Sequence, residues 1–144
     1  MIFKRTAAII YAVASMGVLL FQVALALGAP WGAYAMGGAY PGQFPPVMRV
    51  AALVQALLLL LMAGIVLSRG GVALRRWSRI SRWLIWVVVA FAAVSFVLNL
   101  ITPSAGERML WAPVAFVLFV SSLVVGFIYY GYTTRCARNC AGVA

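Results

Sequence analysis

Four apolar stretches dominate the chain, each about as long as a membrane-spanning helix. The first, Thr6 to Gly28, has 23 uncharged residues and would extend roughly 34 Å as an α-helix, enough to cross a bilayer core. Hydrophobic residues make up 67% of the sequence and charged residues 8%, against roughly half and a quarter in soluble domains. A soluble core of this size cannot hide so much apolar surface. The sequence therefore predicts an integral membrane protein.

We expect an all-α membrane protein, a four-transmembrane-helix bundle of two hairpins that forms one domain over residues 1–144. The expected spans cover residues 6–28, 49–68, 83–101 and 109–132. An outer loop (29–48), a basic loop (69–82), an outer turn (102–108) and a tail (133–144) complete the chain. A secretory signal is the alternative for the first stretch, but the apolar regions of signal peptides are shorter, about 7–15 residues.

Cationic residues predict the orientation of these spans. Short loops rich in Lys and Arg stay on the cytoplasmic side of a membrane. Under the proposed topology nine cations lie inside and two, Arg49 and Arg108, lie outside. We therefore expect both termini in the cytoplasm. A bacterial cytoplasmic (inner) membrane as the location is implied by the resemblance described below. Arginines of the basic loop are expected to contact anionic lipid headgroups, and the spacing of three of them suits a short interfacial helix. These residues are Arg69, Arg75, Arg76, Arg79 and Arg82.

The expected outer loop is rich in glycine, proline and aromatic residues and carries no charge between Gly28 and Pro46. Glycine and proline interrupt helices. Trp31, Tyr34 and Tyr40 suit the headgroup zone, where aromatic rings anchor membrane proteins. The pattern favours an ordered loop that lies against the end of the bundle.

Few polar side chains occur inside the spans, and three amides, Gln22, Gln55 and Asn99, fall in the outer half. We expect them to face one another within the bundle. Hydrogen bonds between helices are one interpretation, worth about 0.6 kcal/mol each on average. A ligand or substrate pocket is the other.

The residue inventory argues against catalysis. The sequence has no His and no Asp, so neither an imidazole base nor a Ser-His-Asp relay can form. Lys4 is the only lysine. No carboxylate lies within an expected span, and this absence disfavours a proton-coupled exporter. Cys136 and Cys140 are too few for a tetrahedral metal site. We expect no enzyme activity, no cofactor and no metal. The net charge of +10 is explained by topology, so nucleic acid is not an expected partner.

Glu107 is the only acidic residue and is expected in the outer turn, beside Arg108. Two interpretations remain open for it. It is a solvated charge in a turn, or it forms an ion pair that ties two outer segments together, with Arg49 as the possible distant partner.

Two segments carry a resemblance. One combines Gly28-Ala29-Pro30-Trp31-Gly32 with Gly37-Gly38 and Pro45-Pro46-Val47-Met48-Arg49. The other is the run Asn99-Leu100-Ile101-Thr102-Pro103-Ser104-Ala105-Gly106-Glu107-Arg108-Met109-Leu110-Trp111-Ala112-Pro113-Val114. The chain resembles a family of uncharacterised small bacterial inner-membrane proteins with four transmembrane helices. The resemblance implies the topology and directs attention to the outer face, but it implies no activity.

The leading functional hypothesis is a non-enzymatic membrane protein that binds, at its outer end, a lipid-like or apolar ligand or a partner membrane protein. The alternatives are a transporter or channel formed by a homo-oligomer or larger membrane complex, with the three amides lining a path, and, less favoured, an enzyme acting on lipid headgroups. The candidate binding residues are Gln22, Trp31, Arg49, Gln55, Asn99, Glu107, Arg108 and Trp111.

Overall fold

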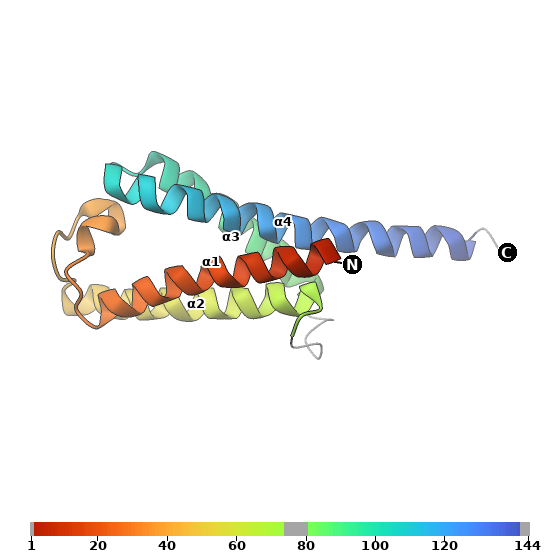
Figure 1. Cartoon of the computed structure of the whole chain (residues 1–144), viewed down its shortest axis with the longest axis horizontal. Helices are drawn as coiled ribbons and strands as arrows, with labels where there is room; N and C mark the ends of the chain where they lie inside the picture. Colours follow the sequence, from red (N-terminus) through yellow and green to blue (C-terminus); the bar gives the residue numbers. More distant parts are fainter. Residues whose placement is uncertain (1, 74–80, 142–144) are drawn as a thin grey trace.

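The computed structural model describes the backbone of residues 2–73 and 81–141, and side chains as far as residue 128 (Figure 1). Four long helices and two short 3-10 helices make up these ranges, which contain no strand. Each long helix has a segment long and apolar enough to cross a membrane. The prediction of an all-helical bundle with four spans is therefore confirmed. The elements are α1 (Ile2–Ala26), η1 (Gly32–Tyr34), η2 (Met36–Gly38), α2 (Pro46–Gly70), α3 (Ser81–Ile101) and α4 (Ala105–Ala141).

The helix ends follow from local residue chemistry. After α1, Gly28 adopts a φ of 98°, and the amides of Gly28 and Ala29 donate to the carbonyls of Leu25 and Ala24. This is a Schellman motif, which needs a residue that tolerates positive φ. Proline suits the first position of a helix because its missing N–H would be unpaired there, and α2 begins at Pro46.

The last helix is longer than the sequence suggested. Its apolar span covers Ala105–Ile128, but the helix continues to Ala141 and runs past the start of α1 in Figure 1. Most of the segment expected as a tail is therefore helical. Cys136 and Cys140 both lie on this extension of α4.

The four helices form two antiparallel hairpins, α1 with α2 and α3 with α4, as expected. The hairpins meet mainly through α1 and α4, whereas α2 and α3 share a much smaller contact. Figure 1 shows the hairpins close together at one end of the bundle and apart at the other, where η1 and η2 lie between them. We call the end near Lys4, Arg69 and Arg82 the basic end. The opposite end, with residues 27–45 and 102–104, is the loop end.

The main core fills the half of the bundle nearest the basic end. All four helices contribute to it, and its buried members are Ala7, Ala8, Tyr11, Val66, Ile85, Val88, Leu118 and Val125. At this end α1 and α2 approach so closely that a Cβ on Gly70 would collide with the Cβ of Ala8. Small residues at such crossings are how helices associate in lipid, where no hydrophobic force draws them together.

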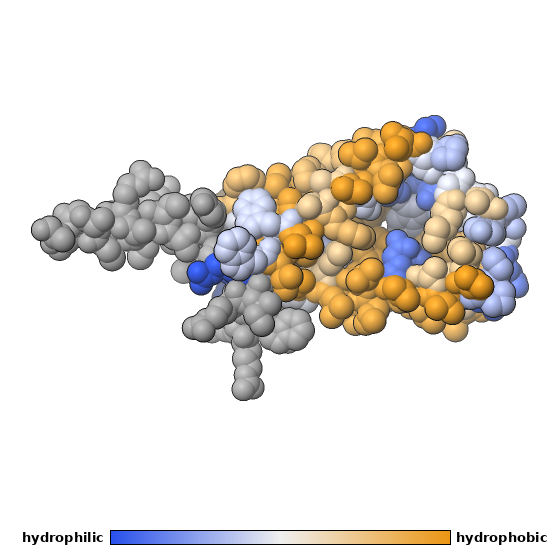
Figure 2. All heavy atoms as spheres, turned by 180° about the vertical axis from the view of Figure 1, so that it is seen from behind, coloured by the Kyte–Doolittle hydropathy of each residue, from blue (hydrophilic) through white to orange (hydrophobic). Residues whose placement is uncertain are grey.

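Large apolar side chains cover much of the outer surface. Leu20, Leu53, Val94 and Phe127 are each more than half exposed. On the face seen in Figure 2, hydrophobic residues extend along much of the length of the bundle. This is the surface expected of helices whose solvent is hydrocarbon.

Candidate functional site

A cavity of about 350 Å³ lies between the hairpins toward the loop end. All four long helices and the loop between α1 and α2 line it. It lies where α2 and α3 diverge, and Figure 2 shows the hollow on the back face of the molecule, with hydrophilic residues inside and hydrophobic residues on both sides. Ligand pockets in proteins typically measure about 300–1,000 Å³, so the cavity is large enough for a small ligand or for part of a lipid.

The wall of the cavity is mostly apolar. Helix α2 contributes Leu58 and Leu59, and α3 contributes Phe91, Val94 and Leu98. On the α1 side Phe21 packs edge-on against Trp111, with ring centroids 4.6 Å apart, and lies parallel to Trp31 at 6.1 Å. Trp31 and Trp111 thereby hold the Phe21 ring in place in the cavity wall.

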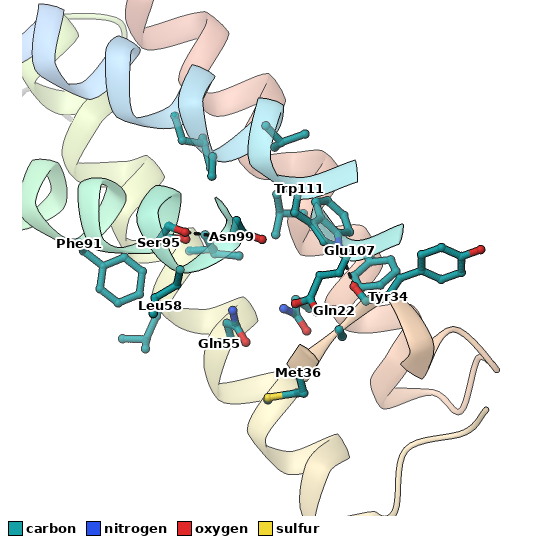
Figure 3. A pocket seen from close by; sticks show the side chains of 18 of the residues that line it. Gln22, Tyr34, Met36, Gln55, Leu58, Phe91, Ser95, Asn99, Glu107 and Trp111 are labelled. Atoms are coloured by element: carbon teal, nitrogen blue, oxygen red, sulfur yellow. Dashed lines mark hydrogen bonds between the residues drawn. The ribbon is translucent and has the colours of Figure 1, made fainter. Parts of the chain in front are cut away.

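Apart from the Tyr34 phenol, five polar side chains interrupt this apolar wall, and Figure 3 labels all of them: Gln22, Gln55, Asn99, Glu107 and Ser95. The fifth, Ser95, lies one turn before Asn99, whose Nδ2 donates to the Ser95 carbonyl at 2.8 Å. The amide nitrogen of Asn99 therefore bonds within its own helix and not to a neighbouring helix.

Gln22 and Gln55 differ from Asn99 because neither side-chain amide takes part in a hydrogen bond within the described ranges. Gln22 is only 7% exposed, whereas Gln55 is exposed at the mouth of the cavity. Gln55 follows Pro46, the first residue of α2, by nine positions, roughly 14 Å along the helix. Gln22 has little water to bond because it is buried, and Gln55 because it lies deep in an apolar span, so both side chains need a polar partner inside the cavity.

Glu107 lies at the edge of the cavity, in the first turn of α4. Its Oε2 accepts hydrogen bonds from the Gly37 amide at 2.7 Å and from the Thr102 hydroxyl at 3.1 Å. Gly37 has a φ of 71°, a conformation that residues with a Cβ rarely adopt, and this backbone geometry directs its N–H toward the carboxylate. The N-terminus of α4 also favours a negative charge at this position.

Two further hydrogen bonds fasten the loop to α4. The Ser104 hydroxyl donates to the Ala33 carbonyl at 3.1 Å and accepts from the Glu107 amide at 3.3 Å, as the N-cap of α4. The Trp111 indole donates to the Tyr34 carbonyl at 2.8 Å. The loop and the start of α4 therefore form one unit, which closes the loop end of the cavity.

The structure separates the predicted binding residues into two groups. Gln22, Gln55, Asn99, Glu107 and Trp111 line the cavity. Trp31, Arg49 and Arg108 lie outside its lining, Trp31 supporting it through Phe21.

The two arginines bond to the backbone. Arg49 Nε donates to the Phe44 carbonyl at 2.9 Å, with its guanidinium against Gly28, and Arg108 reaches the Thr102 carbonyl at 3.5 Å. An ion pair between Arg49 and Glu107 is therefore not what joins the outer segments. Glu107 joins them through the backbone amide of Gly37.

Sequence reasoning missed two parts of the site. The apolar wall of α2 and α3 carried no signal, because most residues on these helices are apolar. The start of α4 did carry one. Ser104-Ala105-Gly106-Glu107 matches the S-x-x-E pattern of a capping box. That pattern indicates a helix start at Ser104, although it does not reveal that the carboxylate bonds a residue 70 positions away.

Arg69, at the basic end, was expected to contact anionic lipid headgroups, and its burial differs from that expectation. This side chain is 4% exposed, so it is buried at the end of α2 rather than spread on the headgroup surface. Lys4 lies near it, half-buried, while Arg82 is exposed as expected. Arg75, Arg76 and Arg79, and the interfacial helix expected there, lie outside the described residues.

No cluster of three or more His, Cys, Asp or Glu side chains that could hold a metal ion occurs in the described ranges. Comparison with models of protein families, with curated proteins and with solved structures gave no match. The fold and the site thus define the class on their own: a four-helix membrane bundle with a cavity between its hairpins.

Proposed function

We propose that this chain is a non-enzymatic membrane protein that binds a lipid-like molecule in the cavity between its hairpins. The polar head of the ligand occupies the cavity, and its apolar tail leaves between α2 and α3 into the surrounding lipid. The observation that carries the proposal is Gln22, a buried amide with no partner in the described ranges, which lines a cavity whose wall is mostly apolar. A ligand head supplies the hydrogen bonds that this amide lacks.

The proposal includes location and orientation. In the proposed orientation both termini lie in the cytoplasm of a bacterial cell, and the loop end and its cavity face the periplasmic half of the inner membrane. The positive-inside rule, applied to the cations of the sequence, supports this orientation. The resemblance to small four-span bacterial inner-membrane proteins supports the same placement. A tag at either terminus should accordingly be protected from periplasmic reagents in intact cells.

A transport path through one chain fits the geometry less well. The three amides that would line such a path all contribute to one cavity at the loop end, and the packed core of Tyr11, Val66, Ile85 and Val88 lies between that cavity and the basic end. Binding needs only the cavity. An enzyme is disfavoured because Glu107 has no second acid or base beside it in a chain without His or Asp.

The test fills the cavity. Ala115 is buried in the lining, whereas Ala90 is an exposed alanine of α3 outside it. Native mass spectrometry of protein extracted from its own membranes should show a bound lipid-like molecule in the wild type and in Ala90→Phe, and its loss in Ala115→Phe. Equal retention in both variants would place the bound molecule elsewhere and overturn the proposal.

A further inference from the structure

The charges and hydrogen-bonding groups of the cavity lining indicate which kind of ligand head it selects. Glu107 is the only charged residue among those that line the cavity. Its Oε2 is engaged by Gly37 and Thr102, and no described residue donates to its Oε1. A carboxylate oxygen can accept more than one hydrogen bond, so the carboxylate retains capacity for a donor supplied by a ligand.

The cations of the loop end do not offset this charge inside the cavity. Arg49 and Arg108 lie outside the lining and donate to the carbonyls of Phe44 and Thr102. A ligand head with a negative charge would thus be desolvated beside a carboxylate with no cation in contact, which is costly.

The remaining groups of the lining also suit a cation. The side chains of Gln22 and Gln55 have free carbonyl oxygens, and Asn99 keeps its Oδ1 because its hydrogen bond uses Nδ2. Phe21, Trp111 and other aromatic residues contribute to the wall. Aromatic faces attract cations, more strongly where water is excluded.

We propose that the cavity selects amphiphiles whose head is a protonated amine, which donates to Glu107 and to two of the amide oxygens of Gln22, Gln55 and Asn99. This inference rests on the proposed function, since it specifies the ligand of the same cavity. The amine belongs either to a membrane lipid, such as one with an ethanolamine head, or to a free amphipathic amine that partitions into the bilayer.

The experiment compares three probes with the same chain length, dodecylammonium, dodecylglycerol and dodecylphosphonate, bound to protein in an uncharged maltoside detergent. Dodecylammonium should bind at least about tenfold more tightly than the other two, and Ala115→Phe should abolish this binding. The chain has a net charge of +10, so non-specific attraction favours the phosphonate. A preference for the ammonium must therefore come from the site.

Two variants test the residues. Glu107→Gln removes the charge but leaves a carbonyl oxygen for Gly37, and it should reduce the preference for ammonium about tenfold. Gln55→Lys leaves the contacts of Glu107 untouched, places a cation at the cavity mouth and should shift the preference toward the phosphonate. In nanodiscs, retention of an ethanolamine lipid over a glycerol lipid identifies a membrane source, while binding of added dodecylammonium alone identifies a free amine.

The two failures are distinguishable. If the phosphonate binds as tightly as the ammonium and Ala115→Phe abolishes both, the cavity binds lipid-like molecules but the amine selectivity is wrong. If Ala115→Phe leaves the binding of every probe unchanged, the proposed function fails together with the inference.

Discussion

The two halves of the bundle use the same helices in opposite ways. Near the basic end, residues from all four helices close around Tyr11 and Ile85, and the backbones of α1 and α2 approach at Ala8 and Gly70. Near the loop end, the smaller cluster of Leu25, Phe44 and Ala52 involves only the first hairpin and its loop. The hairpins there enclose a cavity instead of a core.

The difference shows what decides packing when every helix face is apolar. Hydrophobicity does not choose between a closed and an open arrangement in lipid, because hydrocarbon chains solvate the helices equally well. Small residues permit the close approach at the basic end. At the loop end, the loop fastened to α4 is inserted between the hairpins and holds them apart (Figure 1).

Removing the carboxylate that fastens the loop should have the largest effect on stability. Glu107→Ala leaves the Gly37 amide and the Thr102 hydroxyl without their acceptor. We expect a loss of about 3 kcal/mol in the free energy of unfolding, since hydrogen bonds to charged groups contribute about 1.5–3 kcal/mol each. Limited proteolysis should then cut residues 29–45 faster. Glu107→Gln, which retains an acceptor, should show a smaller change. Equal cleavage of the wild type and both variants would contradict the role of Glu107 in fastening the loop to α4.

A matched pair of glycine-to-alanine substitutions tests the close packing near the basic end. Gly70→Ala places a methyl group against Ala8, and overpacking of this kind costs about 1–3 kcal/mol. Gly17, also in a helix, has nothing within 4 Å of the position a Cβ would take, so Gly17→Ala should leave stability unchanged or raise it by up to about 1 kcal/mol. Unfolding in mixed micelles measures both. A Gly70→Ala protein as stable as Gly17→Ala would mean that α1 and α2 are not closely packed there.

Much of the fold could be predicted because membrane spans leave a strong signal. Charge-free runs gave the four spans, and Gly28 and Pro46 mark helix ends whose chemistry is local. The positions of Gln22, Gln55 and Asn99 along the chain also placed all three in the outer half of the bundle, and they line one cavity. Depth depends only on position along the helix, which the sequence supplies.

What could not be predicted depends on rotation and on distant contacts. The rotation of α2 exposes Gln55 at the cavity mouth, and in helices that are apolar on every side the sequence does not specify it. The partner of Glu107 is a backbone amide, which has no sequence signature at all. The burial of Arg69 has the same origin, because burial at the end of α2 depends on how the neighbouring helices pack.

The smallest expected change in stability is an increase, and it concerns the half of the bundle near the loop end. Gln22→Leu replaces a buried amide that has no partner in the described ranges by an apolar side chain. In detergent without ligand, stability should rise by up to about 1 kcal/mol, because an unsatisfied polar group is removed from an apolar site.

The same variant should lose the copurifying molecule, whereas Gln43→Leu, an identical change at an exposed loop position, should keep it. If Gln22 lowers the stability of the protein but is required for the ligand, the half of the bundle near the loop end serves binding. If Gln22→Leu instead lowers stability and leaves binding intact, the amide belongs to the packing of α1, and the contrast between the two halves would be structural only.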